Sequence, residues 1–167
     1  MNNQNPDTTA NNSIRDIKQR VEEIGIFYEQ TTLTPMEARV FALLLLADPP
    51  EMDFFAIQDF LQASKSTISN ALKRLMNEGR VDYITKPGDR KRYFRVSVLR
   101  WLEQIQESFA SVGPFVSTLN KVIDLRKDTN SPEFNRELLY IKDYFLFLKE
   151  ELPRIQAKWN ERKRSAD

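Results

Sequence analysis

Two residue types are absent from this chain of 167 residues, which contains no cysteine and no histidine. It therefore has no disulfides, no thiolate nucleophile, no imidazole base and none of the usual Cys and His ligands of zinc or iron. Only four glycines occur, and they form no phosphate-binding loop. These absences argue against an enzyme, and we expect neither a cofactor nor a metal ion.

Long apolar runs are also missing from the sequence. The longest extends from Val40 to Ala47, far short of the roughly 20 residues that a helix needs to cross a bilayer. The first dozen residues are polar and rich in Asn, unlike a secretion signal. We therefore expect a cytoplasmic protein that does not bind membranes, with a disordered tail over residues 1–12.

A helix-turn-helix pattern begins at Asp53. This residue can cap a helix starting at Phe54, in which Phe54, Ile57 and Leu61 share one apolar face. About three residues then remain for a turn, and Ser64 can cap the next helix. This spacing suits two helices of a DNA-binding motif.

The second helix is expected over 65–78, with Gly79 as its left-handed stop. Its apolar stripe faces inward, while the other face carries hydroxyls, an amide and cations. Such groups can reach base edges and phosphates in a major groove, which is wide enough to admit a helix. The candidates for DNA contact on this element are Ser64, Lys65, Ser66, Thr67, Ser69, Asn70, Lys73 and Arg74.

A basic hairpin follows the second helix. Residues 80–84 and 90–96 predict two strands, and residues 86–89 between them carry the Pro and Gly typical of a turn. The order of helix, turn, helix and hairpin is that of a winged helix-turn-helix. The hairpin adds Lys86, Asp89, Arg90, Lys91 and Arg92 to the candidates for DNA contact.

The charge is distributed unevenly although the formal net charge is only +1. Residues 64–95 contain nine Lys or Arg and three acidic residues, whereas residues 34–63 contain one basic and five acidic residues. A polyanion such as DNA responds to this local asymmetry.

A core helix is expected to begin at the N-cap Thr34, with Pro35 in its first position and Glu37 in its third. Its leucines would fill the interior of the winged domain. Further along the chain, Gly113-Pro114 and Pro153 are expected to break or kink two long helices.

Three further segments, 14–28, 102–123 and 134–159, repeat apolar residues at alternating steps of three and four. This is the spacing of helices that pack lengthwise. The last segment is apolar on more than one face, which favours a second copy of the chain as an additional partner; a bundle within one chain is the alternative. The predicted dimer interface comprises Ile17, Val21, Ile24, Phe109, Val116, Leu138, Ile141, Phe145, Leu148 and Leu152.

These patterns predict a mainly α fold with a small β-hairpin wing. Residues 13–96 would hold an N-terminal helix and the winged helix-turn-helix, and residues 97–164 the helical dimerisation region. Two-fold symmetry would place two DNA-reading helices about 34 Å apart, which suits a pseudo-palindromic site on double-stranded DNA.

Three segments resemble the winged domain of MarR-type regulators, and among its branches the GbsR-like group. They are residues 33–40 (LTPMEARV), 64–75 (SKSTISNALKRL) and 87–94 (PGDRKRYF). The resemblance implies a homodimeric repressor, associated with the nucleoid when bound, whose second motif helix enters the major groove. It also implies that Arg90 probes the minor groove and that Asp89 orients Arg90.

The GbsR-like branch includes sensors of choline and related osmoprotectants, so the resemblance makes a quaternary ammonium a candidate effector. A regulator without a ligand, or one with a different small molecule, remains open. Aromatic faces bind such cations. The aromatic side chains that would form a cage are Trp101, Phe109, Phe115, Tyr140, Tyr144, Phe147 and Trp159, although aromatic residues at helical spacing more often belong to a core.

Two other functions remain open. A winged helix can serve as a protein-interaction module, but such a surface does not need three adjacent cations at 90–92. A non-specific nucleic-acid-binding protein is the second alternative, and a net charge of +1 is low for a protein that depends on phosphate attraction alone.

Overall fold

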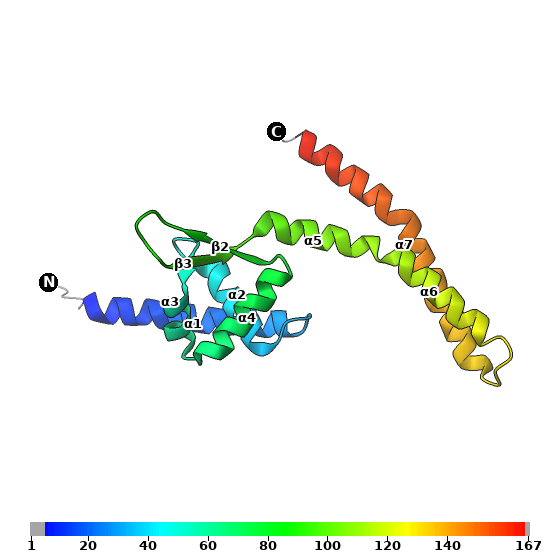
Figure 1. Ribbon diagram of the computed structural model, residues 1–167, viewed down its shortest axis with the longest axis horizontal. Coiled ribbons are helices and arrows are strands. Elements are labelled where there is room, and N and C mark those ends of the chain that lie inside the picture. The colour runs from blue at the N-terminus through cyan, green and yellow to red at the C-terminus, as the bar shows by residue number, and fades with distance from the viewer. Residues whose placement is uncertain (1–5, 166–167) are drawn as a thin grey trace. The chain divides into compact units, whose positions relative to one another are not determined.

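The computed structural model describes residues 6–165 (Figure 1). The chain divides into two compact units, and the boundary lies between Gln104 and Ile105. The first unit contains α1 (Pro6–Glu29), α2 (Pro35–Leu46), β1 (Met52–Asp53), α3 (Phe54–Leu61), α4 (Lys65–Asn77), β2 (Val81–Thr85) and β3 (Arg92–Val96). Helix α5 (Val98–Ala110) begins in the first unit and ends in the second, which also contains α6 (Val112–Leu125) and α7 (Pro132–Arg164). The predicted fold class, mainly α with a small hairpin wing, is confirmed.

Helix α1 begins earlier than the sequence predicts. It starts at Pro6, so the part of the expected disordered tail from residue 6 to residue 12 is helical; residues 1–5 lie outside the described residues. Proline is favoured in the first helical turn. This local preference favours a helix although the segment has few apolar side chains.

Helix α2 begins at the predicted position. The carboxylate of Glu37 accepts a hydrogen bond from the backbone N–H of Thr34 at 2.9 Å, and Pro35 occupies the first helical position. Helix α2 is buried along most of its length, because α1, α3, α4 and the sheet all pack on it.

The helix-turn-helix also has the predicted boundaries, within one residue. Asp53 caps α3, and Ser64 caps α4. Gly79 has φ of +66°, the left-handed conformation expected of the stop after α4. Gln62, at the end of α3, is also left-handed at φ of 50°, which a sequence pattern does not reveal for a residue other than glycine.

The wing belongs to a three-stranded antiparallel sheet of order β1-β3-β2. Tyr83 pairs with Phe94 between β2 and β3, while Met52 pairs with Phe94 between β1 and β3. Strand β1 was not predicted, because two residues are too few to show the alternation of a strand. It places Asp53 directly beside Tyr93 of the wing.

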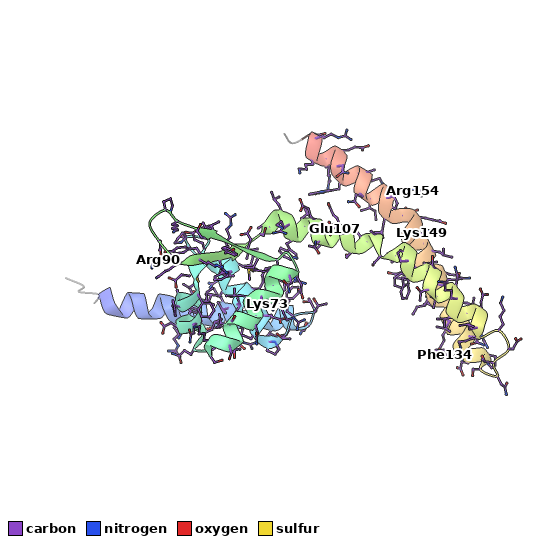
Figure 2. All side chains as sticks on the ribbon, viewed as in Figure 1. Lys73, Arg90, Glu107, Phe134, Lys149 and Arg154 are labelled. Atoms are coloured by element: carbon purple, nitrogen blue, oxygen red, sulfur yellow. The ribbon has the colours of Figure 1, made fainter. Side chains whose placement is uncertain are left out.

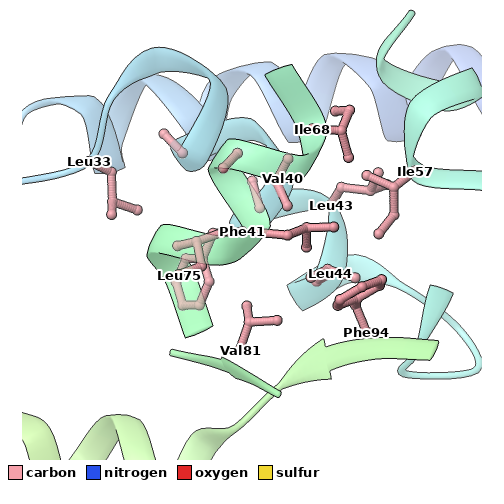
Figure 3. Packing of buried hydrophobic residues seen from close by; sticks show 14 of the residues in the cluster. Leu33, Val40, Phe41, Leu43, Leu44, Ile57, Ile68, Leu75, Val81 and Phe94 are labelled. Atoms are coloured by element: carbon pink, nitrogen blue, oxygen red, sulfur yellow. The ribbon is translucent and has the colours of Figure 1, made fainter. Parts of the chain in front are cut away.

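The core of the first unit lies between α2, α4 and the sheet (Figure 3). Phe41 is fully buried and its ring contacts Tyr28 and Trp101 edge to face, with centroid distances of 5.0 and 5.2 Å. The other fully buried large side chains are Val40, Leu44, Ile57, Ile68, Leu72, Leu75 and Val81. Because Trp101 belongs to this aromatic cluster, its environment is that of a core residue.

The second unit is built on the antiparallel pair α6 and α7. Ser111 separates α5 from α6, so the predicted break falls just before Gly113-Pro114, which lie in the first turn of α6. Proline is tolerated there, since the N–H groups of a first turn have no partner within the helix. Helix α7 continues through Pro153.

Part of the predicted dimer interface is buried within one chain instead. Val21 is 3% exposed and belongs to the core of the first unit, with Ile24 packed against it, because α1 lies on α2. Val116 is 4% exposed on α6, which packs on α7. The structure thus corrects the expectation for these residues, whose apolar faces are satisfied by the same polypeptide.

The remaining predicted interface residues keep accessible surface. Ile17, Phe109 and Ile141 are exposed, and Leu138, Phe145, Leu148 and Leu152 are half-buried. The ring of Phe145 packs on Phe115 of α6, with a centroid distance of 4.4 Å.

Among the described residues no helix is both long enough and apolar enough to cross a membrane.

Candidate nucleic-acid interface

The start of α4 is held by a small hydroxyl cluster. The Ser64 hydroxyl oxygen accepts a hydrogen bond from the backbone N–H of Thr67 at 3.2 Å and lies 2.7 Å from the Thr67 hydroxyl. It also lies 2.9 Å from the hydroxyl of Ser66. Ser64 therefore has a structural role as helix cap, while the exposed side chains that follow it are available to DNA.

The two faces of α4 differ as predicted. Ile68, Ala71, Leu72 and Leu75 are buried against the core. The opposite face is exposed and presents the predicted side chains of Lys65, Ser66, Thr67, Ser69, Asn70 and Lys73. A helix of this kind, anchored on one face and polar on the other, has the form required for insertion in a major groove.

Arg74 lies on the same helix but has a partner within the protein. Its Nε is 3.1 Å from Oε1 of Glu37, whose side chain is only 4% exposed, and its guanidinium is 4.0 Å from Glu78. A buried carboxylate needs a compensating cation. Arg74 therefore ties the DNA-reading helix α4 to the start of α2.

The wing tip is shaped by Asp89. Gly88 has φ of +79°, and the Asp89 carboxylate accepts hydrogen bonds from the backbone N–H of Lys91 at 2.9 Å and from the Tyr93 hydroxyl at 2.6 Å. The Tyr93 hydroxyl, followed by the Lys91 N–H, holds the pKa of Asp89 below its usual value. The hydrogen bond likewise raises the pKa of Tyr93. The Asp89 carboxylate thus holds the backbone just after Arg90 and the side chain of Tyr93, while an orienting effect on Arg90 itself stays a prediction.

Most wing cations are engaged with other side chains. Lys86 lies 2.5 Å from Glu51 and its ammonium lies over the ring of Tyr93, 4.2 Å from the centroid. Lys91 is 3.0 Å from Asp53. The remaining contacts are an ion pair of Arg95 with Asp82 at 2.8 Å and a cation–π contact of Arg92 with Tyr83 at 4.6 Å.

These ion pairs are reflected in the pKa values of their members. Hydrogen bonds to Glu51, Asp53 and Asp82 raise the pKa values of Lys86, Lys91 and Arg95, respectively. Burial acts to raise the pKa of Asp53, but the Lys91 ammonium and two backbone N–H groups outweigh it, so this pKa lies below its usual value. Lys86, Lys91, Arg95 and Asp53 are therefore charged at neutral pH.

Four basic side chains of the interface have no acidic partner among the described residues. They are Lys65 and Lys73 on α4, Arg90 at the wing tip and Arg92 in β3, and all are exposed. Lys73 and Arg90 are labelled in Figure 2. Such charges keep their whole field available to a polyanion, whereas a cation already paired with a carboxylate attracts phosphate less strongly.

An open groove of about 670 Å³ joins α4 to the wing. Ser69 and Lys73 line it from α4, and Arg90, Lys91 and Arg92 line it from the wing. Its floor is apolar and includes Leu72, Met76 and Phe94. The groove therefore brings together five of the predicted candidates, two from α4 and three from the wing; the other candidates do not line it.

The sequence analysis did not assign a role at this interface to Glu37, Glu51 or Asp82, and it assigned Asp53 only as a helix cap. Their cationic partners are distant in the sequence. Arg95 is 13 residues from Asp82, and Lys91 is 38 residues from Asp53. The only available signal was the acidic surplus of residues 34–63 immediately before the basic segment. That surplus indicates opposite charges but not which residues meet.

The aromatic side chains proposed as a cage have several different environments. Trp101 packs in the core of the first unit, and Phe115 packs on Phe145 in the second. Tyr140, Tyr144 and Phe147 are exposed on α7. Trp159 and Phe109 line two different open pockets of the second unit.

Part of the chain is similar to a curated protein. No protein-family model matches the sequence. Over 81 residues the chain is 32% identical to the HTH-type transcriptional regulator MmpR5 of Mycobacterium tuberculosis (strain ATCC 25618 / H37Rv), a match that covers 48% of this chain. The chain spans about half the length of this curated relative, 49%.

A solved structure shows the same fold. The crystal structure of a transcriptional regulator aligns with a TM-score of 0.67 and 22% identity, covering 87% of this chain and 99% of that one. A mutant MarR from E.coli complexed with operator DNA aligns with a TM-score of 0.39 and 14% identity, values too low to bear on function. The relative and the first structure are both described as transcriptional regulators, not as enzymes.

Proposed function

We propose that this protein is a DNA-binding transcriptional regulator of the MarR type, which reads a specific double-stranded site with α4 and the wing. The observation that carries the proposal is that Lys73 of α4 and Arg90 of the wing, two cations without an acidic partner in the described chain, line the same groove. Similarity to MmpR5, itself described as an HTH-type transcriptional regulator, supports it.

The side chains divide by the chemistry they offer. Ser66, Thr67, Ser69 and Asn70 are the short polar groups of α4 that can reach base edges, while Lys65 and Lys73 bind phosphates. Arg90 extends from the wing tip into a minor groove, where a cation benefits from the negative potential. Arg74 has a smaller role in DNA contact than predicted, because Glu37 already binds it.

The number of free cations sets the expected salt dependence. Of the nine basic residues between 64 and 95, five are paired with carboxylates: Arg74, Arg80, Lys86, Lys91 and Arg95. The other four would give a slope of log K against log salt of about −3.6 for each chain, since each neutralised phosphate contributes about −0.9. If all nine contacted phosphate, the slope would be about −8.

The test is binding of the purified protein to labelled DNA from its own upstream region, measured by fluorescence anisotropy across a salt series. A scrambled duplex of the same length and composition is the control. We expect tight binding that resists the scrambled competitor. Equal binding to both duplexes would favour a non-specific nucleic-acid-binding protein, and no binding at low salt would favour a protein-interaction module.

The regulator acts as a homodimer in this proposal, and the second unit provides the interface. Phe109 and Ile141 are 40% and 44% exposed, and Tyr140 and Phe147 on α7 are 80% and 58% exposed. Exposed apolar surface of this extent is a feature of protein interfaces. A two-fold axis would place two copies of α4 one DNA turn apart on a pseudo-palindromic operator.

The proposal has a finer part. The protein would be a repressor of the GbsR-like branch, located in the cytoplasm and associated with the nucleoid when bound. Its effector would be a quaternary ammonium osmoprotectant. Choline and glycine betaine added to the anisotropy assay test this part, with sodium chloride at equal ionic strength as the control for choline chloride. An unchanged operator affinity would remove these effectors while leaving DNA binding intact.

A further inference from the structure

Asp53 joins three elements of the first unit. It is the last residue of β1, the cap of α3 and the neighbour of Tyr93 across the sheet. One carboxylate oxygen accepts hydrogen bonds from the backbone N–H groups of Phe55 at 2.9 Å and Ala56 at 3.2 Å. The other accepts a hydrogen bond from the ammonium of Lys91 at 3.0 Å.

A second tie lies two residues earlier in the same segment. Glu51 pairs with Lys86 at 2.5 Å. Lys86 precedes the wing tip and Lys91 follows it, so the chain is fastened on both sides of Arg90. Both carboxylates are largely buried, with side chains 16% exposed at Glu51 and 15% at Asp53.

We propose that Asp53 is a positioning residue for DNA binding, which acts through Lys91 to hold the wing tip and Arg90 at a fixed place relative to α3 and α4. This inference rests on the proposed function. With the ion pair present, the wing is ordered before DNA arrives. Without it, part of the binding energy is lost to ordering the wing in the complex.

Simple electrostatics predicts the opposite effect of removing this carboxylate. A negative charge beside a DNA-binding surface repels phosphate, so its removal should strengthen binding. The sign of the change in affinity therefore separates a positioning role from a charge that merely lies near DNA.

The decisive variant is Asp53→Asn, whose amide oxygen can still cap α3 while the ionic partner of Lys91 is lost. The matched control is Asp59→Asn, which removes the same charge from α3 at an exposed side chain without an ion pair in the described chain. We expect Asp53→Asn to bind operator DNA about two- to fivefold more weakly, in line with the strength of a partly exposed ion pair. Asp59→Asn should bind as well as the wild type or slightly better.

A second readout separates positioning from loss of fold. In an Arg90→Ala background, Asp53→Asn should cause no further loss, because the wing no longer has its groove contact to position. Asp53→Ser, which also retains a favoured capping side chain, should repeat the result if the Asn variant unfolds. Thermal melts of every variant accompany the binding curves.

Unchanged or tighter binding by Asp53→Asn would overturn the inference, as would an equal loss in the Arg90→Ala background. In either case wild-type binding to the operator would leave the proposed function standing. Failure of the wild-type protein to bind its upstream DNA would overturn the proposed function, and this inference with it.

Discussion

Replacing Arg90 with alanine should weaken operator binding without lowering the stability of the folded protein. Arg90 is exposed at the wing tip and has no partner within the described residues, so its removal breaks no contact in the free protein. A base or groove contact by arginine contributes about 1–3 kcal/mol, which corresponds to a loss of roughly 5- to 150-fold in affinity. The melting temperature should remain that of the wild type.

Arg95→Ala provides the comparison for this prediction. It removes the same charge from β3 of the same wing, but Arg95 is already paired with Asp82 at 2.8 Å. If an ion pair within the protein keeps a cation from binding DNA, Arg95→Ala should reduce the affinity for DNA much less than Arg90→Ala. Fluorescence anisotropy with one operator duplex at two salt concentrations measures both. The salt slope should become shallower by about 1 for each chain with Arg90→Ala, or about 2 for the proposed dimer.

Two results would refute this reasoning. Equal losses for the two variants would show that ion pairs within the protein do not select the DNA-binding cations. An Arg90→Ala variant with wild-type affinity would remove the wing tip from the mechanism altogether.

Three other perturbations test separate parts of the account. Leu148→Asp introduces a charge at a half-buried position of α7 and should dissociate or unfold the proposed dimer; sedimentation that shows an unchanged species would contradict the interface. Glu37→Ala removes the partner of both the Thr34 N–H and Arg74 and should lower the free energy of unfolding by about 1–3 kcal/mol. The measurement is urea unfolding, and the control is Glu103→Ala, an exposed carboxylate without an ion pair in the described chain. The pKa of Asp89 is lowered, so its contribution to stability is present above about pH 4 and is lost as the pH falls through the lowered pKa. The pKa of Tyr93 is raised, so its contribution is present below about pH 10 and is lost as the pH rises through the raised pKa. The difference in melting temperature between wild type and Tyr93→Phe should therefore be largest between these limits, and a difference independent of pH would show that the Asp89–Tyr93 hydrogen bond does not contribute.

Local signals in the sequence were sufficient for the motif itself. Asp53, Ser64 and Gly79 each act through the few residues beside them, so their effects can be predicted without knowledge of the tertiary structure. The apolar face of α4 follows from the helical period in the same way.

The features that depend on distant residues could not be predicted. The pairing of Lys91 with Asp53 joins residues 38 positions apart, and strand β1 exists only because β3 lies beside it. The left-handed turn at Gln62 reflects the tight connection between α3 and α4, which overrides the preference of the residue.

The apolar repeats illustrate a different limit. Spacing at three and four residues indicates that a helix packs lengthwise but does not identify its partner. Val21 was assigned to a contact between chains and instead completes the core beside α2 of its own chain. Leu148 and Ile141 retain exposed surface after α6 has packed on α7, so the proposed interface now rests on that surface.

Hydroxyl-radical footprinting on the upstream DNA tests the central claim most directly. A dimer that inserts two copies of α4 in successive major grooves should protect two backbone segments about one helical turn apart, with centres roughly 10 base pairs from each other. Addition of scrambled competitor DNA should leave this pattern unchanged. Uniform protection along the duplex, or none at low salt, would contradict specific recognition by this protein.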